Sequence, residues 1–110
     1  MSLVQKIRKA RESRVEVGGY GFQIRRPTAL EMIEINGKPR GRAYLAFVIG
    51  WDGVTPLDAV PGGEPHPLEF DADVCAEWLT DRLDLLAPLT EAIDAAYAAH
   101  EARLEDSKKN

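Results

Sequence analysis

Cys75 and the two histidines are the side chains of this sequence with the clearest catalytic potential. A cysteine thiolate becomes a nucleophile when a nearby base takes its proton, and His66 and His100 are the available bases. However, Cys75 lies between Val74 and Ala76 in the first turn of a predicted amphipathic helix. A cysteine in that position is usually a small buried hydrophobic residue. We therefore expect no catalytic role for Cys75.

The histidines do not suggest a metal site either. His66 lies within a Pro-His-Pro segment, and His100 lies on the apolar face of the last predicted helix. Zinc sites need several ligands at short characteristic spacings, and neither histidine is followed by another histidine or cysteine three or four residues later. We expect no metal and no cofactor. The serines, Ser2, Ser13 and Ser107, lie outside any G-x-S-x-G nucleophile motif.

A glycine-rich segment and two pairs of carboxylates could also suggest an active site. Gly18–Gly21 precedes a predicted strand, whereas a phosphate-binding loop leads directly into a helix, so we interpret this segment as a hairpin turn. Asp71 with Asp73, or Asp81 with Asp84, could form an acid–base pair. Their positions on helices favour solvated faces instead. None of these groups is therefore expected to assemble into an active site.

Basic residues are concentrated in the first 42 positions and suggest nucleic-acid binding as an alternative. Tyr20 and Phe22 lie among them on a predicted hairpin, and a β-ribbon flanked by arginines can enter a DNA groove. The isoelectric point of about 5.2 opposes this alternative, because the acidic remainder of the chain repels phosphate. The basic residues concerned are Arg8, Lys9, Arg11, Arg14, Arg25, Arg26, Arg40 and Arg42.

The net charge of −4 conceals two parts of opposite sign. Residues 1–42 carry ten basic and four acidic side chains, a net charge of +6, whereas residues 43–106 carry two basic and fourteen acidic ones, a net charge of −12. Such a chain could pair head to tail with copies of itself. The candidate self-association residues are Arg25, Arg26, Arg40 and Arg42. Alternatively, the charges only solubilise two faces of one fold.

Size and composition predict one cytoplasmic domain. A length of 110 residues is typical of a single domain, and 45% hydrophobic residues suffice for a modest core. One cysteine cannot form an intramolecular disulfide. The first charge, at Lys6, comes too early for the apolar region of a signal peptide. We expect a single domain over 1–110, in which 1–12 and 106–110 are flexible.

The N-terminal part predicts a short basic helix over 3–11 and then a β-hairpin over 13–26. In the hairpin, a two-residue turn at Gly19-Tyr20 would place four apolar side chains on one face. These are Val15, Val17, Phe22 and Ile24. We prefer this turn to one at Gly18-Gly19, which would set Glu16 against Gly21.

The remaining segments predict helices separated by one long loop. Thr28 and Glu31 form a capping box for a helix that ends at Asn36-Gly37. The apolar run 43–51 lacks alternation and precedes Gly53, so we favour a helix with a left-handed cap there. Residues 55–69 are rich in proline and glycine and predict a loop.

The C-terminal part predicts two further helices. Asp71 is a suitable N-cap for the first of them, whose buried stripe would comprise Val74, Trp78 and Leu79. Pro88 is expected to break or restart the helix near Ala87. One face of the last helix would then carry Leu89, Ile93, Ala96, Tyr97, His100 and Leu104. The predicted fold class is α+β: a mostly α-helical single domain with one N-terminal β-hairpin.

This arrangement resembles the tail assembly chaperones of long-tailed bacteriophages and prophages, which are small, mostly helical α+β proteins. The resemblance covers roughly residues 14–110. Pro56 departs from it, because family members more often carry an acidic residue there, and contacts of this loop are the least transferable. It rests on a series of segments in a fixed order. They are the hairpin-like Val15–Ile24, Arg25-Arg26-Pro27-Thr28, the apolar run closing on Gly50-Trp51-Asp52-Gly53-Val54, the Pro/Gly loop, Phe70-Asp71 before an acidic helix with Trp78-Leu79, and a final helix.

The resemblance implies a non-enzymatic chaperone that binds the tape measure protein and helps recruit tail tube subunits during tail assembly. The implied partners are the tape measure protein, the tail tube protein, a frameshifted longer form of the chain and further copies of itself. The implied location is the host bacterial cytoplasm and not the mature virion. The candidate partner-binding residues, each of which could instead belong to the core, are Tyr44, Phe47, Trp51, Val54, Trp78 and Tyr97.

The final residues provide a separate hint of the frameshifted form. Lys108-Lys109-Asn110 can be encoded by a run of adenines on which a ribosome can slip, and members of this family typically end near such a site. An ordinary polar C-terminus is the alternative. The runner-up function is a small protein-interaction or nucleic-acid-binding module of prophage origin that uses the basic N-terminal hairpin.

Overall fold

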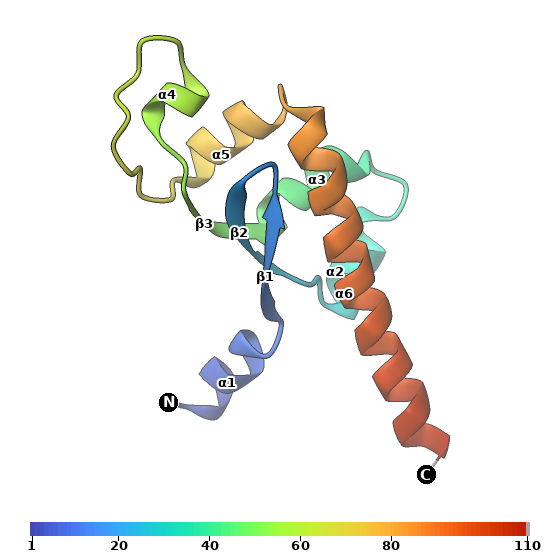
Figure 1. Ribbon diagram of the computed structural model, residues 1–110. Coiled ribbons are helices and arrows are strands. Elements are labelled where there is room, and N and C mark those ends of the chain that lie inside the picture. Colours follow the sequence, from blue (N-terminus) through green and yellow to red (C-terminus); the bar gives the residue numbers. More distant parts are fainter. Residues whose placement is uncertain (110) are drawn as a thin grey trace.

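A three-stranded antiparallel sheet lies at the centre of the molecule, with helices around it (Figure 1). The computed structural model describes residues 1–109. It confirms the predicted α+β class and its N-terminal hairpin, and it adds a third strand. The elements are α1 (Leu3–Lys9), β1 (Glu12–Val17), β2 (Tyr20–Arg25), α2 (Ala29–Ile35), α3 (Arg40–Tyr44), a 3-10 helix η1 (Leu45–Phe47), β3 (Val48–Asp52), α4 (Pro56–Ala59), α5 (Ala72–Leu79) and α6 (Leu83–Lys109).

The hairpin turn lies at Gly18-Gly19, so the predicted turn at Gly19-Tyr20 is wrong. Gly18 and Gly19 adopt φ angles of +61° and +86°, and a type I′ turn requires positive φ at both central positions. Tyr20 could adopt such a φ only with strain. The observed register pairs Val15 with Phe22 and Val17 with Tyr20. The apolar side chains still share one face, as expected, because the observed register differs from the predicted one by an even number of residues.

The apolar run after α3 is not one helix, as the sequence suggested. Helical geometry ends at Phe47, and β3 continues the chain as an antiparallel partner of β2, with Phe22 opposite Trp51. Without β3, the edge of β2 opposite β1 would leave backbone groups unpaired beside the core. β-branched and aromatic side chains suit that position. Gly53 does have a left-handed φ of +82°, but it ends a strand rather than a helix.

The loop between β3 and α5 is fixed to the core by Trp51. Its indole Nε1 donates a hydrogen bond of 2.9 Å to the carbonyl oxygen of Leu68. Its ring packs edge-on against Phe70 and Trp78, with centroids 4.8 and 6.0 Å away. The predicted loop over 55–69 also contains the one-turn helix α4, and Tyr20 donates a 2.7 Å hydrogen bond to Asp58 of that helix.

Helix α6 is continuous through Pro88, so the predicted break near Ala87 is wrong. The chain turns earlier, at 80–82, between α5 and α6. Pro88 lies in the second turn of α6 with its ring exposed, and it removes only the backbone hydrogen bond to the carbonyl of Asp84. Leu85, Leu86 and Leu89 are buried on the other side, and their packing holds the helix across the proline.

The core lies between the inner face of the sheet and the helices α5 and α6. Phe22 and Ile24 of the sheet, and Leu79, Leu89 and Ile93 of the helices, are each at most 1% exposed. On the outer face of the hairpin Arg14, Glu16 and Gln23 are exposed. One face of α6 is therefore committed to the core along its N-terminal half.

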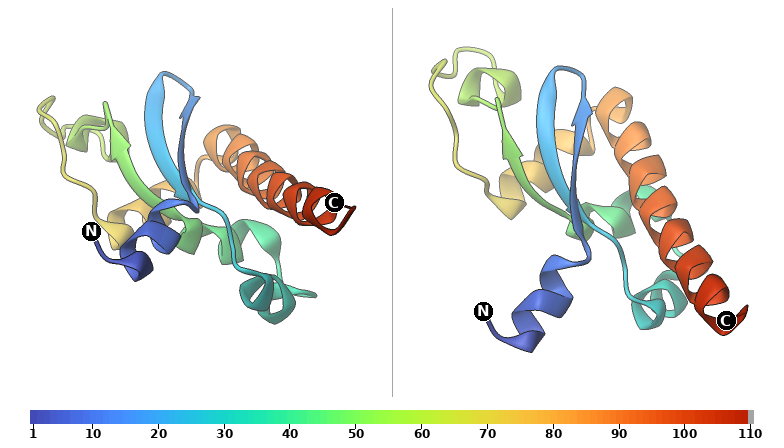
Figure 2. Two further views of the ribbon diagram at one scale, coloured as in Figure 1. Left: turned by 90° about the horizontal axis from the view of Figure 1, so that it is seen from below. Right: turned by 60° about the horizontal axis from the view of Figure 1, so that its bottom comes forward.

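The C-terminal half of α6 extends beyond the sheet, and α2 lies beside it (Figure 2). Residues 101–108 are all exposed. Twenty-seven residues of helix span about 40 Å, a large part of the 57 Å long axis. The predicted flexible tail 106–110 belongs to α6 as far as Lys109, and Asn110 lies outside the described residues. The other predicted flexible end forms α1, capped by Ser2 and Gln5.

Candidate protein-interaction surface

Four of the six residues predicted to bind a partner lie in the core. Tyr44, Phe47, Val54 and Trp78 are 0%, 3%, 1% and 6% exposed. The hydroxyl of Tyr44 also donates a 2.5 Å hydrogen bond to Asp94 of α6, and burial together with this bond raises the pKa of Tyr44 to about 12. The alternative left open by the sequence, a core role, holds for these four residues.

Trp51 and Tyr97 remain partly exposed. Trp51 is occupied by its contacts with the loop and with Trp78, so it serves the fold. Tyr97 of α6 faces α2 instead. It lines a hollow of about 480 Å³ together with Ala29, Met32, Ile33, Asn36 and Glu101. Tyr97 is therefore a partly exposed residue of the predicted set that lies at a surface groove, whereas Trp78, which lines a separate hollow of about 300 Å³, is itself only 6% exposed.

Helix α2 carries two strongly exposed apolar side chains, of which Ile33 lines this groove. Leu30 and Ile33 are 64% and 73% exposed, whereas Met32 and Ile35 of the same helix pack against the core. α2 thus has two apolar faces, one partly buried against the core and one open. The sequence contained the signal, because Leu30, Met32, Ile33 and Ile35 are spaced around the whole helix and cannot all lie on a single face. We refer to the hollow lined by Ala29, Met32, Ile33, Asn36, Tyr97 and Glu101 as the α2–α6 groove.

Helix α1 exposes a second apolar stripe. Leu3, Val4 and Ile7 are 72%, 55% and 47% exposed, and no residue of this helix is buried. Their predicted position on one side of a basic helix is consistent with the structure. Within the described residues, neither the sheet nor another helix covers this stripe.

Two of the four candidate self-association arginines are engaged within the chain. Arg25 donates two 2.8 Å hydrogen bonds to Glu31 and stacks over the ring of Phe47 at 4.7 Å. Arg40 donates a 3.0 Å hydrogen bond to Asp94. These pairs lower the positive charge that Arg25 and Arg40 could offer to another molecule.

The other two differ in burial. Arg42 is exposed on α3, whereas Arg26 is partly buried beside Arg11 and Arg103. Arg14 of the hairpin is held by Glu16 and Asp52, at 3.1 and 3.2 Å. A hairpin whose arginines are paired in this way is a weaker candidate for a groove of nucleic acid, because contacts with phosphate need free positive charge.

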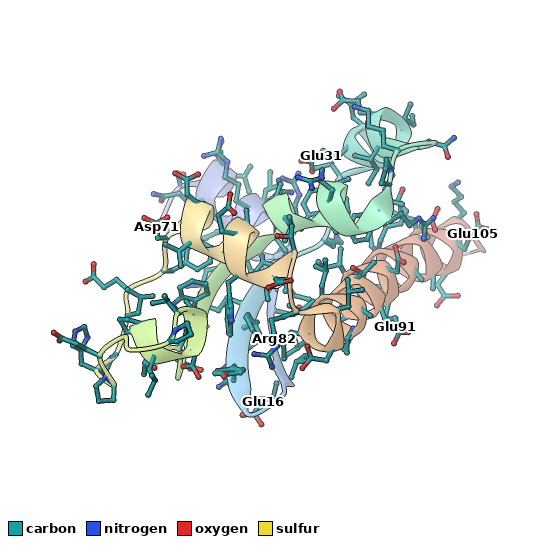
Figure 3. All side chains as sticks on the ribbon, turned by 90° about the horizontal axis from the view of Figure 1, so that it is seen from above. Glu16, Glu31, Asp71, Arg82, Glu91 and Glu105 are labelled. Carbon is teal, nitrogen blue, oxygen red and sulfur yellow. The ribbon has the colours of Figure 1, made fainter. Side chains whose placement is uncertain are left out.

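Charged side chains elsewhere also serve local structure. Arg82, in the turn before α6, lies near the hairpin (Figure 3) and donates two hydrogen bonds, of 3.0 and 2.9 Å, to Asp84. His66 lies 2.9 Å from Glu64. Asp71 caps α5 by accepting hydrogen bonds from the backbone of Asp73 and Val74, which confirms its predicted role.

The residues with catalytic potential are not brought together. Cys75 is 1% exposed, and its burial raises the pKa of its thiol to about 11, which opposes formation of the reactive thiolate. Among residues 1–109, no three His, Cys, Asp or Glu side chains are grouped so that they could hold a metal ion. In the same part of the chain, none of the helices has the length and apolar content needed to span a lipid bilayer.

Comparisons with known proteins give no match. No protein-family model, no curated protein and no solved structure matches the chain. The functional argument therefore rests on the sequence features above and on the surface described here.

Proposed function

We propose that this protein is a tail assembly chaperone that binds a helical segment of a tape measure protein in the α2–α6 groove. The observation that carries this proposal is the hollow between α2 and α6, where the 73% exposed side chain of Ile33 lies with Met32 and Tyr97. The identity of the partner comes from the resemblance to this family, which rests on the order of segments along the sequence.

The shape and chemistry of the groove suit an amphipathic helix. Two helices flank a shallow hollow, and a third helix can lay its apolar stripe into such a groove at spacings of three and four residues. A tape measure protein is a long helical chain that exposes apolar stripes until tail tube subunits surround it. A chaperone must cover these stripes reversibly, and large exposed apolar side chains are the means of doing so.

The remaining parts of the proposal follow from the same role. The tail tube protein and a frameshifted longer form would be further partners. The chaperone would act in the host bacterial cytoplasm and be absent from the mature virion. Copies of the chain would line up along the tape measure protein. The exposed stripe of α1 is a second surface available for such contacts.

The test uses the tape measure protein encoded next to this chain in its genome. The two proteins are produced together, and the affinity of purified chain for tape measure fragments is measured by calorimetry. Ile33→Glu should weaken binding about tenfold or more, because a buried isoleucine contributes roughly 1.5–3 kcal/mol. The wild-type chain should also keep the tape measure protein in the supernatant after centrifugation.

The matched control is Leu83→Glu. Leu83 is 69% exposed, close to the 73% of Ile33, but it lies in the first turn of α6, away from the groove. The Leu83→Glu variant should bind the tape measure fragments with the affinity of the wild type. Absence of any binding to the tape measure protein would contradict the function, whereas equal binding by both variants would contradict only the location of the site.

A further inference from the structure

Three arginines from distant parts of the sequence line one small pocket. Arg11 follows α1, Arg26 follows β2, and Arg103 lies in the C-terminal half of α6. The pocket has a volume of about 290 Å³, and small side chains leave it open, among them Ser13, Ala96 and Ala99. We refer to this site as the arginine pocket.

The backbone fixes two of these arginines relative to each other. The amide nitrogen of Arg26 donates a 2.8 Å hydrogen bond to the carbonyl oxygen of Arg11, which joins the two ends of the hairpin. Arg26 is further held because its Nη1 donates a 3.0 Å hydrogen bond to the carbonyl oxygen of Pro27. The two guanidinium groups therefore come from a rigid part of the fold.

The arginines of this pocket differ from most of the other arginines discussed above in that none forms an ion pair with another described residue. Among the described residues, Arg14, Arg25, Arg40 and Arg82 each form an ion pair with a carboxylate. In the same part of the molecule, no ion pair involves Arg11, Arg26 or Arg103, although Glu12 also lines the pocket. The Nε atoms of Arg11 and Arg26 are buried and have no hydrogen-bond partner there. Such groups are costly to leave unsatisfied.

We propose that Arg11, Arg26 and Arg103 form a binding site for an oxyanion group, either a carboxylate or a phosphate. The planar guanidinium fork matches two oxygens of either group, and a bound anion would offset the mutual repulsion of three like charges. This site stands independently of the proposed partner, because its argument uses neither the α2–α6 groove nor the resemblance.

His100 provides a reporter for the site. It lies one turn before Arg103 on α6, and its pKa is lowered by its partial burial and by the positive charges of Arg26, Arg103 and Arg11, against the opposing charge of Glu101. An anion in the pocket would offset these positive charges and raise the pKa of His100. His66, in the distant Pro-His-Pro segment, serves as the internal control.

The test is a titration of both histidines by NMR in sodium phosphate, in sodium glutarate and in sodium chloride of equal ionic strength. Phosphate or glutarate should raise the pKa of His100 by about half a unit or more beyond chloride, without the same effect on His66. A response to phosphate alone would assign the site to phosphate groups, and a response to glutarate would assign it to carboxylates. Equal values in all three salts would overturn the proposal.

Variants distinguish anion binding in the pocket from general screening by salt. Arg26→Gln and Arg103→Gln should each abolish the specific response, whereas Arg42→Gln, at an exposed arginine of α3, should retain it. Arg103 is exposed near the end of α6, so its variant keeps the test valid if Arg26→Gln fails to fold. A specific response that persists in Arg103→Gln would also overturn the proposal.

Discussion

The ion pair between Arg25 and Glu31 fixes α2, and its removal provides a quantitative test of how that helix is held. Glu31 accepts two 2.8 Å hydrogen bonds from Arg25 and one of 2.9 Å from the backbone amide of Thr28. We choose Glu31→Gln as the perturbation. Glutamine retains the capping box at the start of α2 but removes the charge that faces Arg25.

The size of the effect follows from the pKa of Glu31, which is lowered from 4.5 to about 2, chiefly by the hydrogen bonds from Arg25 and further by Thr28. That difference corresponds to an upper limit of about 3 kcal/mol at neutral pH. The side chain is 30% exposed, so solvent screening reduces the contribution. We expect Glu31→Gln to lower the free energy of unfolding by about 1–2 kcal/mol at pH 7.

The pH dependence identifies the charge as the cause. Because the pKa of Glu31 is lower in the folded state, its stabilisation is complete above about pH 4.5 and is lost as the pH falls toward 2. The difference between wild type and variant should therefore be constant from pH 7 to 5 and shrink below that. Urea unfolding monitored by tryptophan fluorescence measures it, since Trp78 is 6% exposed in the folded protein.

The matched control is Glu34→Gln on the same helix. Glu34 is exposed, and among the described residues it forms no ion pair, so its variant should change stability by less than about 0.5 kcal/mol. Equal destabilisation by the two substitutions, or a loss in Glu31→Gln that does not vary with pH, would refute the assignment to the Arg25–Glu31 pair.

Two further predictions concern α6 and α5. Pro88→Ala should raise the free energy of unfolding by about 1–3 kcal/mol, because alanine restores the backbone hydrogen bond to Asp84 and fits an exposed helical position. Urea unfolding measures this difference, and unchanged stability would contradict the assigned cost of Pro88. Alkylation of Cys75 by iodoacetamide at pH 8 should be limited by the rate at which the protein unfolds locally or globally, because burial raises the pKa of its thiol to about 11. Mass spectrometry measures the alkylation, and rapid alkylation of the folded protein would contradict the burial of Cys75.

Features governed by neighbouring residues could be predicted from the sequence. The capping box of Thr28 with Glu31 and the N-cap at Asp71 both formed as expected. Each depends on contacts within one helical turn. The apolar face of the hairpin was also predicted, since its period of two survives any even shift of register.

Features that depend on distant contacts could not be predicted in this way. Residues 48–52 form a strand because they pair with the free edge of β2. Pro88 lies inside a helix because the leucines before and after it in the sequence are buried in the core. The large aromatic residues were candidates for a partner surface, but a chain of 110 residues needs most of them to fill its core. On α2 the open side chains are Leu30 and Ile33, which helix periodicity alone does not separate from Met32 and Ile35, the residues that pack against the core.

The fold also changes the meaning of the charge division along the sequence. Arg14 pairs with Asp52 and Arg40 pairs with Asp94, so two basic side chains of residues 1–42 are already paired with acidic side chains of residues 43–106. Head-to-tail attraction between whole halves is weakened accordingly, because paired charges at the surface contribute little to a distant partner. The arginine pocket is one concentration of positive charge without ion pairs among the described residues, and it lies beside the same C-terminal half of α6 that lines the α2–α6 groove. A partner bound in the groove as proposed would lie within reach of this pocket, so an oxyanion group on that partner would be selected by a local site rather than by the net charge of the chain.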